Sequence, residues 1–288
     1  MLYRFFVIVV CVLVCPLTFA EKKGKNPSVK PKQSNKSSIT HSFELYEKGQ
    51  KEFTKAHFDK ASDLFEEFVM ANKGKMNDET KKRVFWSIDM IMRIQLRVNK
   101  SPKKAILFLE KINKSFQLND SDFDTIQEWL AVAKEWQGMG KIPKNISSEQ
   151  QLYDLGKKFY DRGHKKSSAA TGKSGNADLY IAATYLIPFV YNFNNSKNIG
   201  EVLYMLGTIR KKSWNDYDYW SENFYLKEVI QRFPHTDLAK KSYTVLEEGI
   251  RFGYTGSGGD FTPPSQIEML KVYKQLAGAE KLKKPIFY

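Results

Sequence analysis

The sequence contains only two cysteines, and both lie close to its N-terminus. Cys11 and Cys15 fall within residues 1–20, a segment that has the features of a removable leader. Without that segment the chain has no cysteine. A disulfide framework, a thiol nucleophile and cysteine ligation of a metal are then excluded, so the fold depends on its apolar core.

Glycine and proline are also scarce, at 17 and 10 of 288 residues. No stretch of useful length alternates apolar and polar residues as a half-buried strand does. Hydrophobic residues make up 42% of the chain, which is sufficient for a sizeable core. The composition therefore predicts an all-α fold rather than a turn-rich sandwich.

Motifs that carry catalysis or bind metals are missing as well. The four histidines are scattered, and no HExxH sequence occurs. The glycine-rich sequence GYTGSGG, residues 253–259, matches neither the GxSxG elbow of a serine hydrolase nor a phosphate-binding loop. We therefore expect no catalytic residue, no metal and no cofactor, and a protein that is not an enzyme.

Residues 1–20 have the three parts of a secretory signal peptide. Arg4 precedes an uncharged apolar run, and Thr18 and Ala20 place small residues just before the expected cleavage site. The segment predicts secretion across the inner membrane, with a final location in the periplasm or at the outer membrane. A membrane anchor that is retained is the alternative.

Part of the formal net charge of +14 lies directly after this segment. Residues 21–39 are rich in lysine, serine, asparagine and proline, and we expect a flexible basic leader. Its charge favours weak contact with an anionic membrane surface or the cell wall, and a solvated spacer is the alternative. No arginine-rich cluster or RNA-binding aromatic motif indicates nucleic acid as a partner.

From residue 40 onward, apolar residues recur at the three- and four-residue spacing of helices. We predict N-terminal helical repeats over residues 40–138 and C-terminal repeats over residues 145–253. A seam is expected between them at residues 138–145, and a polar, exposed insertion at residues 162–178. Residues 254–288 are expected to form a glycine- and proline-containing loop, a last helix and a basic tail.

One short pattern occurs three times in the chain. It is LYEKG at residues 45–49, LYDLG at 152–156 and LYMLG at 203–207. A leucine and a glycine four residues apart share one face of a helix. Because a glycine inside a helix costs about 1 kcal/mol relative to alanine, its recurrence predicts that a neighbouring helix packs closely against it.

Each LYxxG segment is followed by a second predicted helix, and the third of these helices ends near Pro234. Together with the sequence RFPHTDLAKKSY, residues 232–243, the pattern resembles the tetratricopeptide repeat. The likeness is to the repeat proteins of the bacterial cell envelope, such as outer-membrane assembly lipoproteins and Tol-Pal coordinators. The resemblance implies an irregular α-solenoid of antiparallel helix pairs, which acts as a scaffold for a protein or peptide partner.

In this family the partner usually binds in a concave groove lined by the first helix of each pair. The resemblance places eight residues there: Tyr46, Gln50, Phe53, Tyr153, Lys157, Tyr160, Tyr204 and Lys211. Tyrosines beside lysines suit an extended peptide with acidic groups or a C-terminal carboxylate. Packing of the same tyrosines between helices as core is the alternative.

One other interpretation of function stays open, and so does a eukaryotic secreted origin. The aromatic cluster over residues 213–225 contains Trp214 and Trp220, which suit stacking on a sugar ring. The chain is then a glycan-binding or lytic envelope protein that acts on peptidoglycan. In a eukaryotic secreted protein, four Asn-X-Ser sequons would be candidates for glycosylation: Asn113, Asn119, Asn145 and Asn194.

Overall fold

The computed structural model describes residues 34–74, 76–143, 146, 148–169, 173–212 and 219–279. Within these ranges the chain is almost entirely helical, which confirms the predicted all-α class. The predicted signal peptide, most of the basic leader and the basic tail lie outside the described residues. In the described ranges, no helix combines the length and the apolar character needed to cross a membrane.

The described residues form α-helices, one π-helix and a short antiparallel hairpin. The N-terminal elements are α1 (Ser34–Thr54), α2 (Phe58–Ala71), α3 (Asp78–Arg93), the π-helix η1 (Ile94–Val98), α4 (Pro102–Ser115) and α5 (Asp120–Met139). The helices that follow are α6 (Glu149–Ala169), α7 (Asn176–Asn192), α8 (Ile199–Lys212), α9 (Tyr219–Arg232), α10 (Asp237–Tyr254) and α11 (Pro264–Ala277). Between α10 and α11, the hairpin pairs β1 (Thr255–Gly256) with β2 (Gly259–Asp260).

Polar caps fix where several of these helices begin. The side chains of Asn77 and Asn119 each accept a hydrogen bond at 2.8 Å from the backbone N–H three residues further on. Ser101 caps α4 directly before Pro102, which is tolerated in a first turn. Gly140 has a φ of 61° and ends α5, because glycine adopts this left-handed conformation without strain.

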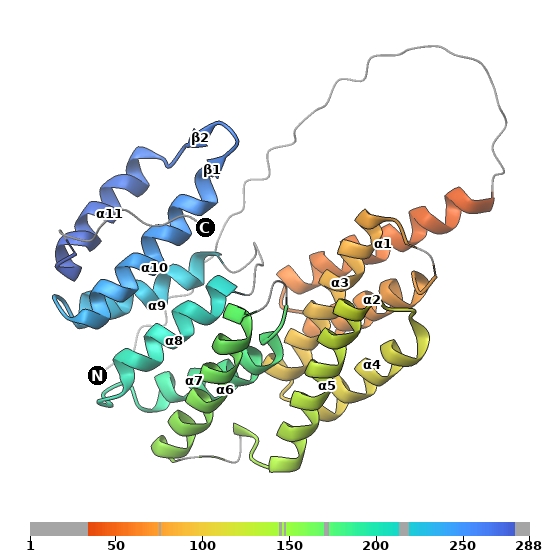
Figure 1. Cartoon of the computed structure of the whole chain (residues 1–288), viewed down its shortest axis with the longest axis horizontal. Helices are drawn as coiled ribbons and strands as arrows, with labels where there is room; N and C mark the ends of the chain where they lie inside the picture. The colour runs from red at the N-terminus through yellow and green to blue at the C-terminus, as the bar shows by residue number, and fades with distance from the viewer. Residues whose placement is uncertain are drawn as a thin grey trace, which may run out of the picture.

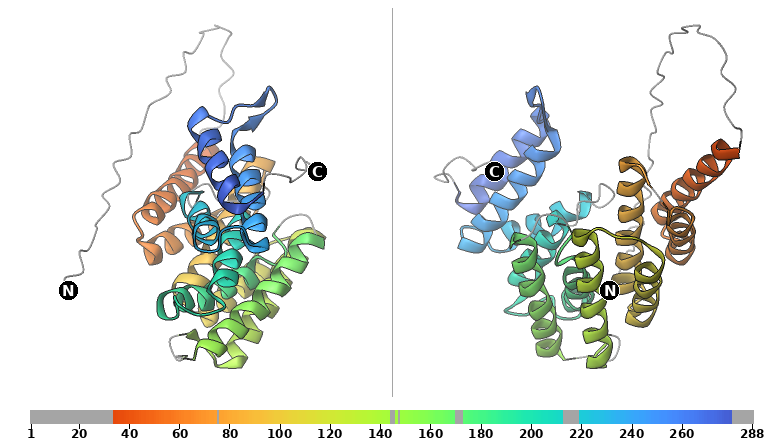
Figure 2. Two further views of the ribbon diagram at one scale, coloured as in Figure 1. Left: turned by 90° about the vertical axis from the view of Figure 1, so that its left-hand side faces the viewer. Right: turned by 45° about the vertical axis from the view of Figure 1, so that its right-hand side comes forward.

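Consecutive helices pack as pairs, and the pairs stack side by side (Figure 1). The pair α1–α2 and the pair α10–α11 lie at opposite ends of the molecule, with α6 and α7 between them (Figure 2). Along the C-terminal part, α6 contacts α8 and α8 contacts α10, so the first helices of three successive pairs are neighbours. This is the arrangement of a helical repeat fold.

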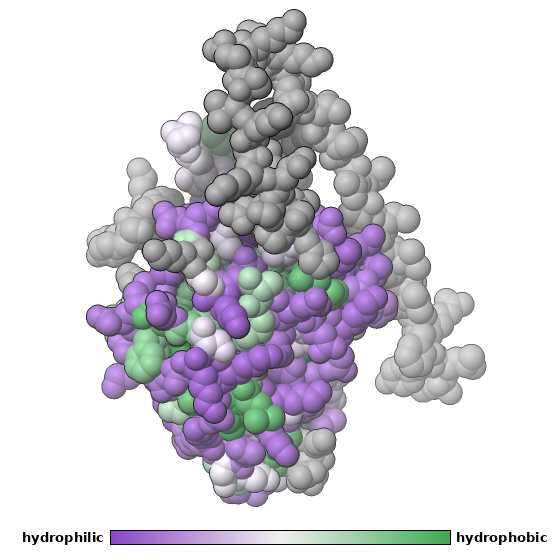
Figure 3. Space-filling model, turned by 90° about the vertical axis from the view of Figure 1, so that its right-hand side faces the viewer, coloured by the Kyte–Doolittle hydropathy of each residue, from purple (hydrophilic) through white to green (hydrophobic). Residues whose placement is uncertain are grey.

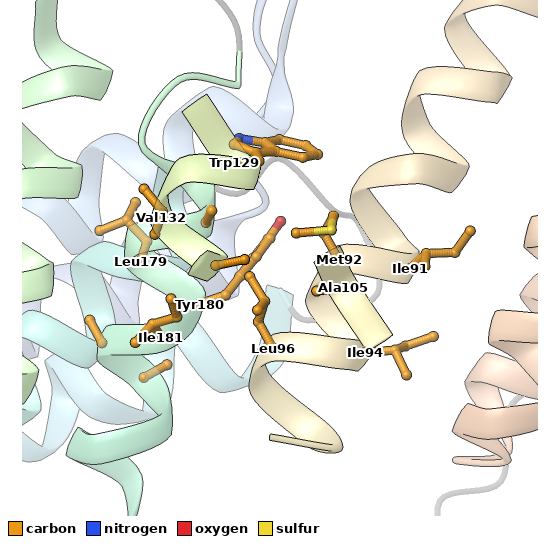
Figure 4. Packing of buried hydrophobic residues seen from close by; sticks show 14 of the residues in the cluster. Ile91, Met92, Ile94, Leu96, Ala105, Trp129, Val132, Leu179, Tyr180 and Ile181 are labelled. Carbon is orange, nitrogen blue, oxygen red and sulfur yellow. The ribbon is translucent and has the colours of Figure 1, made fainter. Parts of the chain in front are cut away.

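Helix α7 lies at the centre of the core. It packs against α6 on one side and against α5, α3 and η1 on the other, where Tyr180 lies close to Met92 and Leu96 (Figure 4). Residues 180–191 are rich in β-branched and aromatic residues, which favour strands. They are helical here because burial on nearly every side outweighs local propensity.

The repeated LYxxG pattern lies in the first helices α1, α6 and α8. Its three leucines are buried: Leu45, Leu152 and Leu203. Each glycine faces a large side chain of the second helix: Phe65 faces Gly49, Leu186 faces Gly156 and Leu226 faces Gly207. A Cβ on Gly207 would lie 2.6 Å from the side chain of Leu226, which is closer than Cβ atoms come to other atoms unless something shifts. The close packing predicted for this glycine is therefore confirmed.

Residues 162–178 do not form the exposed insertion that their polar composition predicts. Helix α6 continues to Ala169 and α7 begins at Asn176, so most of the segment is helical. Asp178 is fully buried, and Lys173 donates a hydrogen bond of 2.7 Å to the backbone carbonyl of Phe85. These polar side chains are satisfied by distant helices instead of water, which composition does not reveal.

Two predicted boundaries are also wrong. One hydrophobic core extends from Leu45 to Val229, so the described residues on the two sides of the predicted seam share a core and do not form two separate halves. A smaller core joins α9, α10 and α11. Helix α1 begins at Ser34, inside the expected leader, because a helix that is already fixed by packing extends at little cost per residue.

Candidate functional site

Five of the eight predicted partner-binding residues lie on the adjacent helices α6 and α8, and the side chains of four of them are described: Tyr153, Lys157, Tyr160 and Tyr204. A hydrogen bond and an ion pair join α6 to α8 through Glu201, and the charge of Glu248 on α10 acts on Tyr204. We name this surface the first-helix face, because α6, α8 and α10 are the first helices of stacked pairs. It is defined by Tyr153, Lys157, Asp161, Glu201, Tyr204 and Glu248.

Tyr153 bridges from α6 to α8. Its hydroxyl donates a hydrogen bond of 2.6 Å to Oε2 of Glu201, and its ring contacts Phe189 of α7. Burial raises the pKa of Tyr153 to about 12, and the carboxylate of Glu201 contributes to the increase. The hydroxyl is therefore a fixed hydrogen-bond donor at neutral pH.

Lys157 lies one turn further along α6 and is held between two carboxylates. Its ammonium group lies 3.2 Å from Oε1 of Glu201 and 3.2 Å from Oδ2 of Asp161. Burial alone would lower the pKa of Lys157, but the two carboxylates outweigh it and raise the pKa. The charge of this lysine is thus compensated within the first-helix face.

Tyr160 and Tyr204 pack between helices to different degrees. Tyr160 is 9% exposed, and its hydroxyl lies 2.8 Å from Oγ1 of Thr208 on α8. For Tyr160 the core-packing alternative is therefore correct. Tyr204 is half-buried, and burial together with the charge of Glu248 on α10 raises its pKa. It links the α8 and α10 parts of the first-helix face.

The predicted residues of α1 lie in a different place, at the N-terminal end of the stack. The ring of Tyr46 packs against Trp86 of α3, with centroids 5.4 Å apart, and its hydroxyl accepts a hydrogen bond of 3.0 Å from Gln50. Phe53 packs edge-on against Phe58 of α2. The structure therefore does not bring these three residues together with those of α6 and α8.

Three predicted residues stay without a structural test. Trp214 and the side chains of Lys211 and Trp220 lie outside the described residues. Stacking of a glycan on the two tryptophans and binding of a partner by Lys211 accordingly remain predictions.

A network of charges around one buried carboxylate, which sequence reasoning missed, joins α5, α6 and α7. The buried carboxylate of Asp178 accepts hydrogen bonds from Arg162 Nε at 2.7 Å and from Lys166 at 2.9 Å. The same cations reach α5, where Arg162 pairs with Glu135 at 2.6 Å and Lys166 pairs with Glu128 at 3.1 Å. Every charge in this network has an opposite partner, and the pairs connect α5, α6 and α7 to one another.

A second buried group joins α3 to α7 and the residues just before it. Oδ1 of Asp89 accepts hydrogen bonds from Tyr180 at 2.9 Å and from Asn176 at 3.2 Å, and Lys173 lies 3.8 Å from Oδ2. Burial raises the pKa of Tyr180 and lowers that of Lys173. These groups contact one another and fix α7 in the stack.

Metal-ligating residues do not gather in the part of the chain that the structure describes, where no group of three or more is placed to hold an ion. Comparisons with protein-family models, with curated proteins and with solved structures give no match to this chain. An assignment of function depends on the residues and their geometry alone.

Proposed function

We propose that this chain is an exported, non-catalytic scaffold of the tetratricopeptide kind, which binds a protein or peptide partner in the cell envelope through its first-helix face. The repeated glycine packing carries the proposal, because it lets α6 and α8 pack tightly on their second helices within one continuous stack. Stacked repeats provide extended binding surfaces of this kind. The signal-peptide features of residues 1–20 support export.

The side chains of the first-helix face suit recognition of a peptide. Tyr153 and Tyr204 are only partly buried and offer aromatic surface. Among the residues that define the face, carboxylates outnumber ammonium groups, and Lys157 is already paired with two of them. We therefore expect a partner that presents basic groups, in place of the acidic peptide that the lysines alone suggest.

Charge reversal on the face tests this function. The double variant Asp161→Lys/Glu248→Lys should reduce capture of the partner at least tenfold, because both changes repel its basic groups. The control Glu79→Lys/Glu268→Lys makes the same charge change on α3 and α11. Quantitative mass spectrometry of proteins retained from extracts of the source cells gives the readout. Equal capture by both variants and the unaltered protein would contradict the proposal.

A further inference from the structure

Two stripes of opposite charge lie beside each other near the N-terminal end of the stack, on helices that do not contribute to the first-helix face. On the outer side of α2, four carboxylates recur at helical spacing: Asp59, Asp63, Glu66 and Glu67. On the outer side of α4, four lysines surround Leu107: Lys103, Lys104, Lys111 and Lys114. We name the surface formed by these nine residues the α2–α4 face.

A groove of about 560 Å³ separates the two stripes. It is lined by carboxylates of α2 and by Lys111 of α4, whose ammonium group lies 2.8 Å from Oε1 of Glu66 across the groove. Near the start of both helices, Asn99 donates a hydrogen bond of 2.9 Å to Asp59. Since contacts join start to start and middle to late part, α2 and α4 run in the same direction with their charged residues at matching levels.

Five of the eight charges have no partner of opposite sign within the chain. Among the described residues, no carboxylate forms an ion pair with Lys103, Lys104 or Lys114. In the same part of the chain, no ammonium group pairs with Asp63 or Glu67. These five side chains are therefore free to pair with groups on another molecule.

Charged residues beside the two stripes do not neutralise them. They are paired with one another or with residues behind the face: Lys60 with Glu52 at 3.4 Å, Glu110 with Lys134 at 3.0 Å, and Asp122 with Lys81 at 2.7 Å. Asp120 and Asp124, in the first turns of α5, form no ion pair with a described residue. The α2–α4 face thus presents an acidic half and a basic half to solvent.

Apolar surface is limited on this face. Leu107 is 58% exposed and is the only large apolar side chain of α2 or α4 that is fully on the surface, while Met70 and Ala71 line the groove. Seen from the end that carries α1 and α2, the molecule is largely hydrophilic, and apolar residues appear in small separate patches (Figure 3). Charge therefore decides which partner fits, and Leu107 offers one apolar anchor.

The charge pattern is complementary to itself. An anionic membrane that is attracted by the lysines of α4 is repelled by the equal number of carboxylates on α2. In a symmetric pair of identical chains, the same patch faces itself, and every contact is made twice. A two-fold axis along the groove places α2 of each copy opposite α4 of the other, at the same level.

We propose that the α2–α4 face joins two copies of this chain in a symmetric dimer. Asp63 of one copy then meets the lysines at positions 103 and 104 of the second copy, and Glu67 meets those at positions 111 and 114. Charge pairs at an interface contribute more to orientation than to affinity, so we expect a Kd on the order of 10 µM. The face shares no residue with the first-helix face, so either proposal can fail without the other.

Sedimentation of the purified chain over a concentration series tests the dimer. The average mass should rise from that of one chain to that of two as the concentration passes the Kd. Raising the salt from about 0.05 M to about 0.5 M should weaken the dimer at least tenfold, because salt screens exposed charge pairs. A chain that stays monomeric, or a dimer whose Kd does not depend on salt, would overturn the proposal.

Charge exchange tests the pairing of α2 with α4. Asp63→Lys/Glu67→Lys reverses two charges of the acidic stripe, and Lys104→Glu/Lys114→Glu reverses two of the basic stripe. Each variant alone should dimerise at least tenfold more weakly, because like charges then face each other twice. An equimolar mixture of the two should regain the affinity of the unaltered protein, since each altered stripe then faces an altered stripe of opposite sign.

A control and two contrary outcomes complete this experiment. Lys241→Glu/Lys274→Glu makes the same charge change on α10 and α11 and should dimerise as the unaltered protein does. A mixture that stays monomeric, although both variants keep their helical circular dichroism, would overturn the proposal. Binding to phosphatidylglycerol vesicles that Lys104→Glu/Lys114→Glu abolishes, without self-association of the unaltered protein, would assign the lysines to a membrane instead. If a variant loses its circular dichroism, the salt series on the unaltered protein decides.

Discussion

At the scale of single residues, one packing contact recurs in three helix pairs. Helical spacing was sufficient to predict it, because leucine and glycine four residues apart must share a face. The side chain that fills the space was not predictable for Gly156. Leu186 occupies it, although Ala183 and Ile187 lie nearby on the same helix, because the exact rotation of α7 depends on packing with distant elements.

Replacing one of these glycines tests the contact. Gly207→Ala should lower the free energy of unfolding by about 1–3 kcal/mol, because a Cβ would overlap Leu226. Gly249→Ala on α10 is the matched control, since no atom lies within 4 Å of the added Cβ. There the free energy of unfolding should rise by up to about 1 kcal/mol through better helix propensity. Urea unfolding of both variants gives the comparison, and equal effects would contradict the packing role.

The tyrosines show where sequence reasoning reached its limit. The pattern placed Tyr153 and Tyr160 on a first helix, which is correct. Helical spacing cannot decide whether such a residue faces an open groove or the next helix, since both lie on neighbouring arcs of the same cylinder. The partners that settle the question, Glu201 and Thr208, are 48 residues further along the chain.

Alkaline pH tests the burial of these tyrosines. The pKa values of Tyr153, Tyr160 and Tyr185 are raised from 10 to about 12, so the unfolded chain loses these protons first. Stability should be fully present below pH 10 and decline between pH 10 and 12, by about 2 kcal/mol for the buried Tyr160. Urea unfolding at pH 9 and pH 11 measures the decline, which should be smaller in Tyr160→Phe. An identical decline in that variant would contradict burial of the phenol.

At the scale of elements, apolar spacing predicted most helices. A local signal such as Ser101 before Pro102, a cap followed by a first-turn proline, is enough to mark where α4 begins. Polar composition misled the prediction between α6 and α7. Asp178 and Lys173 have the appearance of loop residues because their partners are remote: Lys173 bonds the carbonyl of Phe85, 88 residues away. A single sequence contains no local signal for such a contact.

Neutralising Asp178 tests the charge network that holds α5, α6 and α7. Asp178→Asn should lower the free energy of unfolding by about 3 kcal/mol, because Arg162 and Lys166 then lose their shared buried partner. Asp161→Asn is the matched control, since this carboxylate is 55% exposed and its pairing contributes less than about 1 kcal/mol. Thermal and urea unfolding give the values. Two similar small losses would show that the network does not stabilise the stack.

At the scale of the whole molecule, one hydrophobic core is continuous from α1 to α9. Contacts that cross residues 138–145 include Trp136 with the hydroxyl of Tyr185 at 2.6 Å, and Thr184 with the carbonyl of Leu96 at 3.2 Å. A breaker sequence marks the end of a helix but not the edge of a core, which is why the predicted seam was wrong.

Cutting the chain between residues 143 and 146 tests whether the two parts fold as one cooperative unit. Fragments 34–143 and 146–279 should each lack a cooperative thermal transition, because the cut exposes the apolar face that α7 shares with α3, α5 and η1. Circular dichroism melting and binding of a hydrophobic dye give the readout. A fragment that melts cooperatively near the transition of the whole chain would restore the predicted seam between the N-terminal and C-terminal repeats.

The most direct test of the central claim, that the first-helix face binds the partner, is photo-crosslinking from defined surface positions. A photoreactive residue replaces Asp161 or Glu201, which are 55% and 42% exposed on first helices, or Tyr191 or Phe224, which are 82% and 55% exposed on second helices. In extracts of the source cells, we expect one discrete adduct from positions 161 and 201 and none from 191 and 224. Adducts that form equally or only from the second helices would contradict the account.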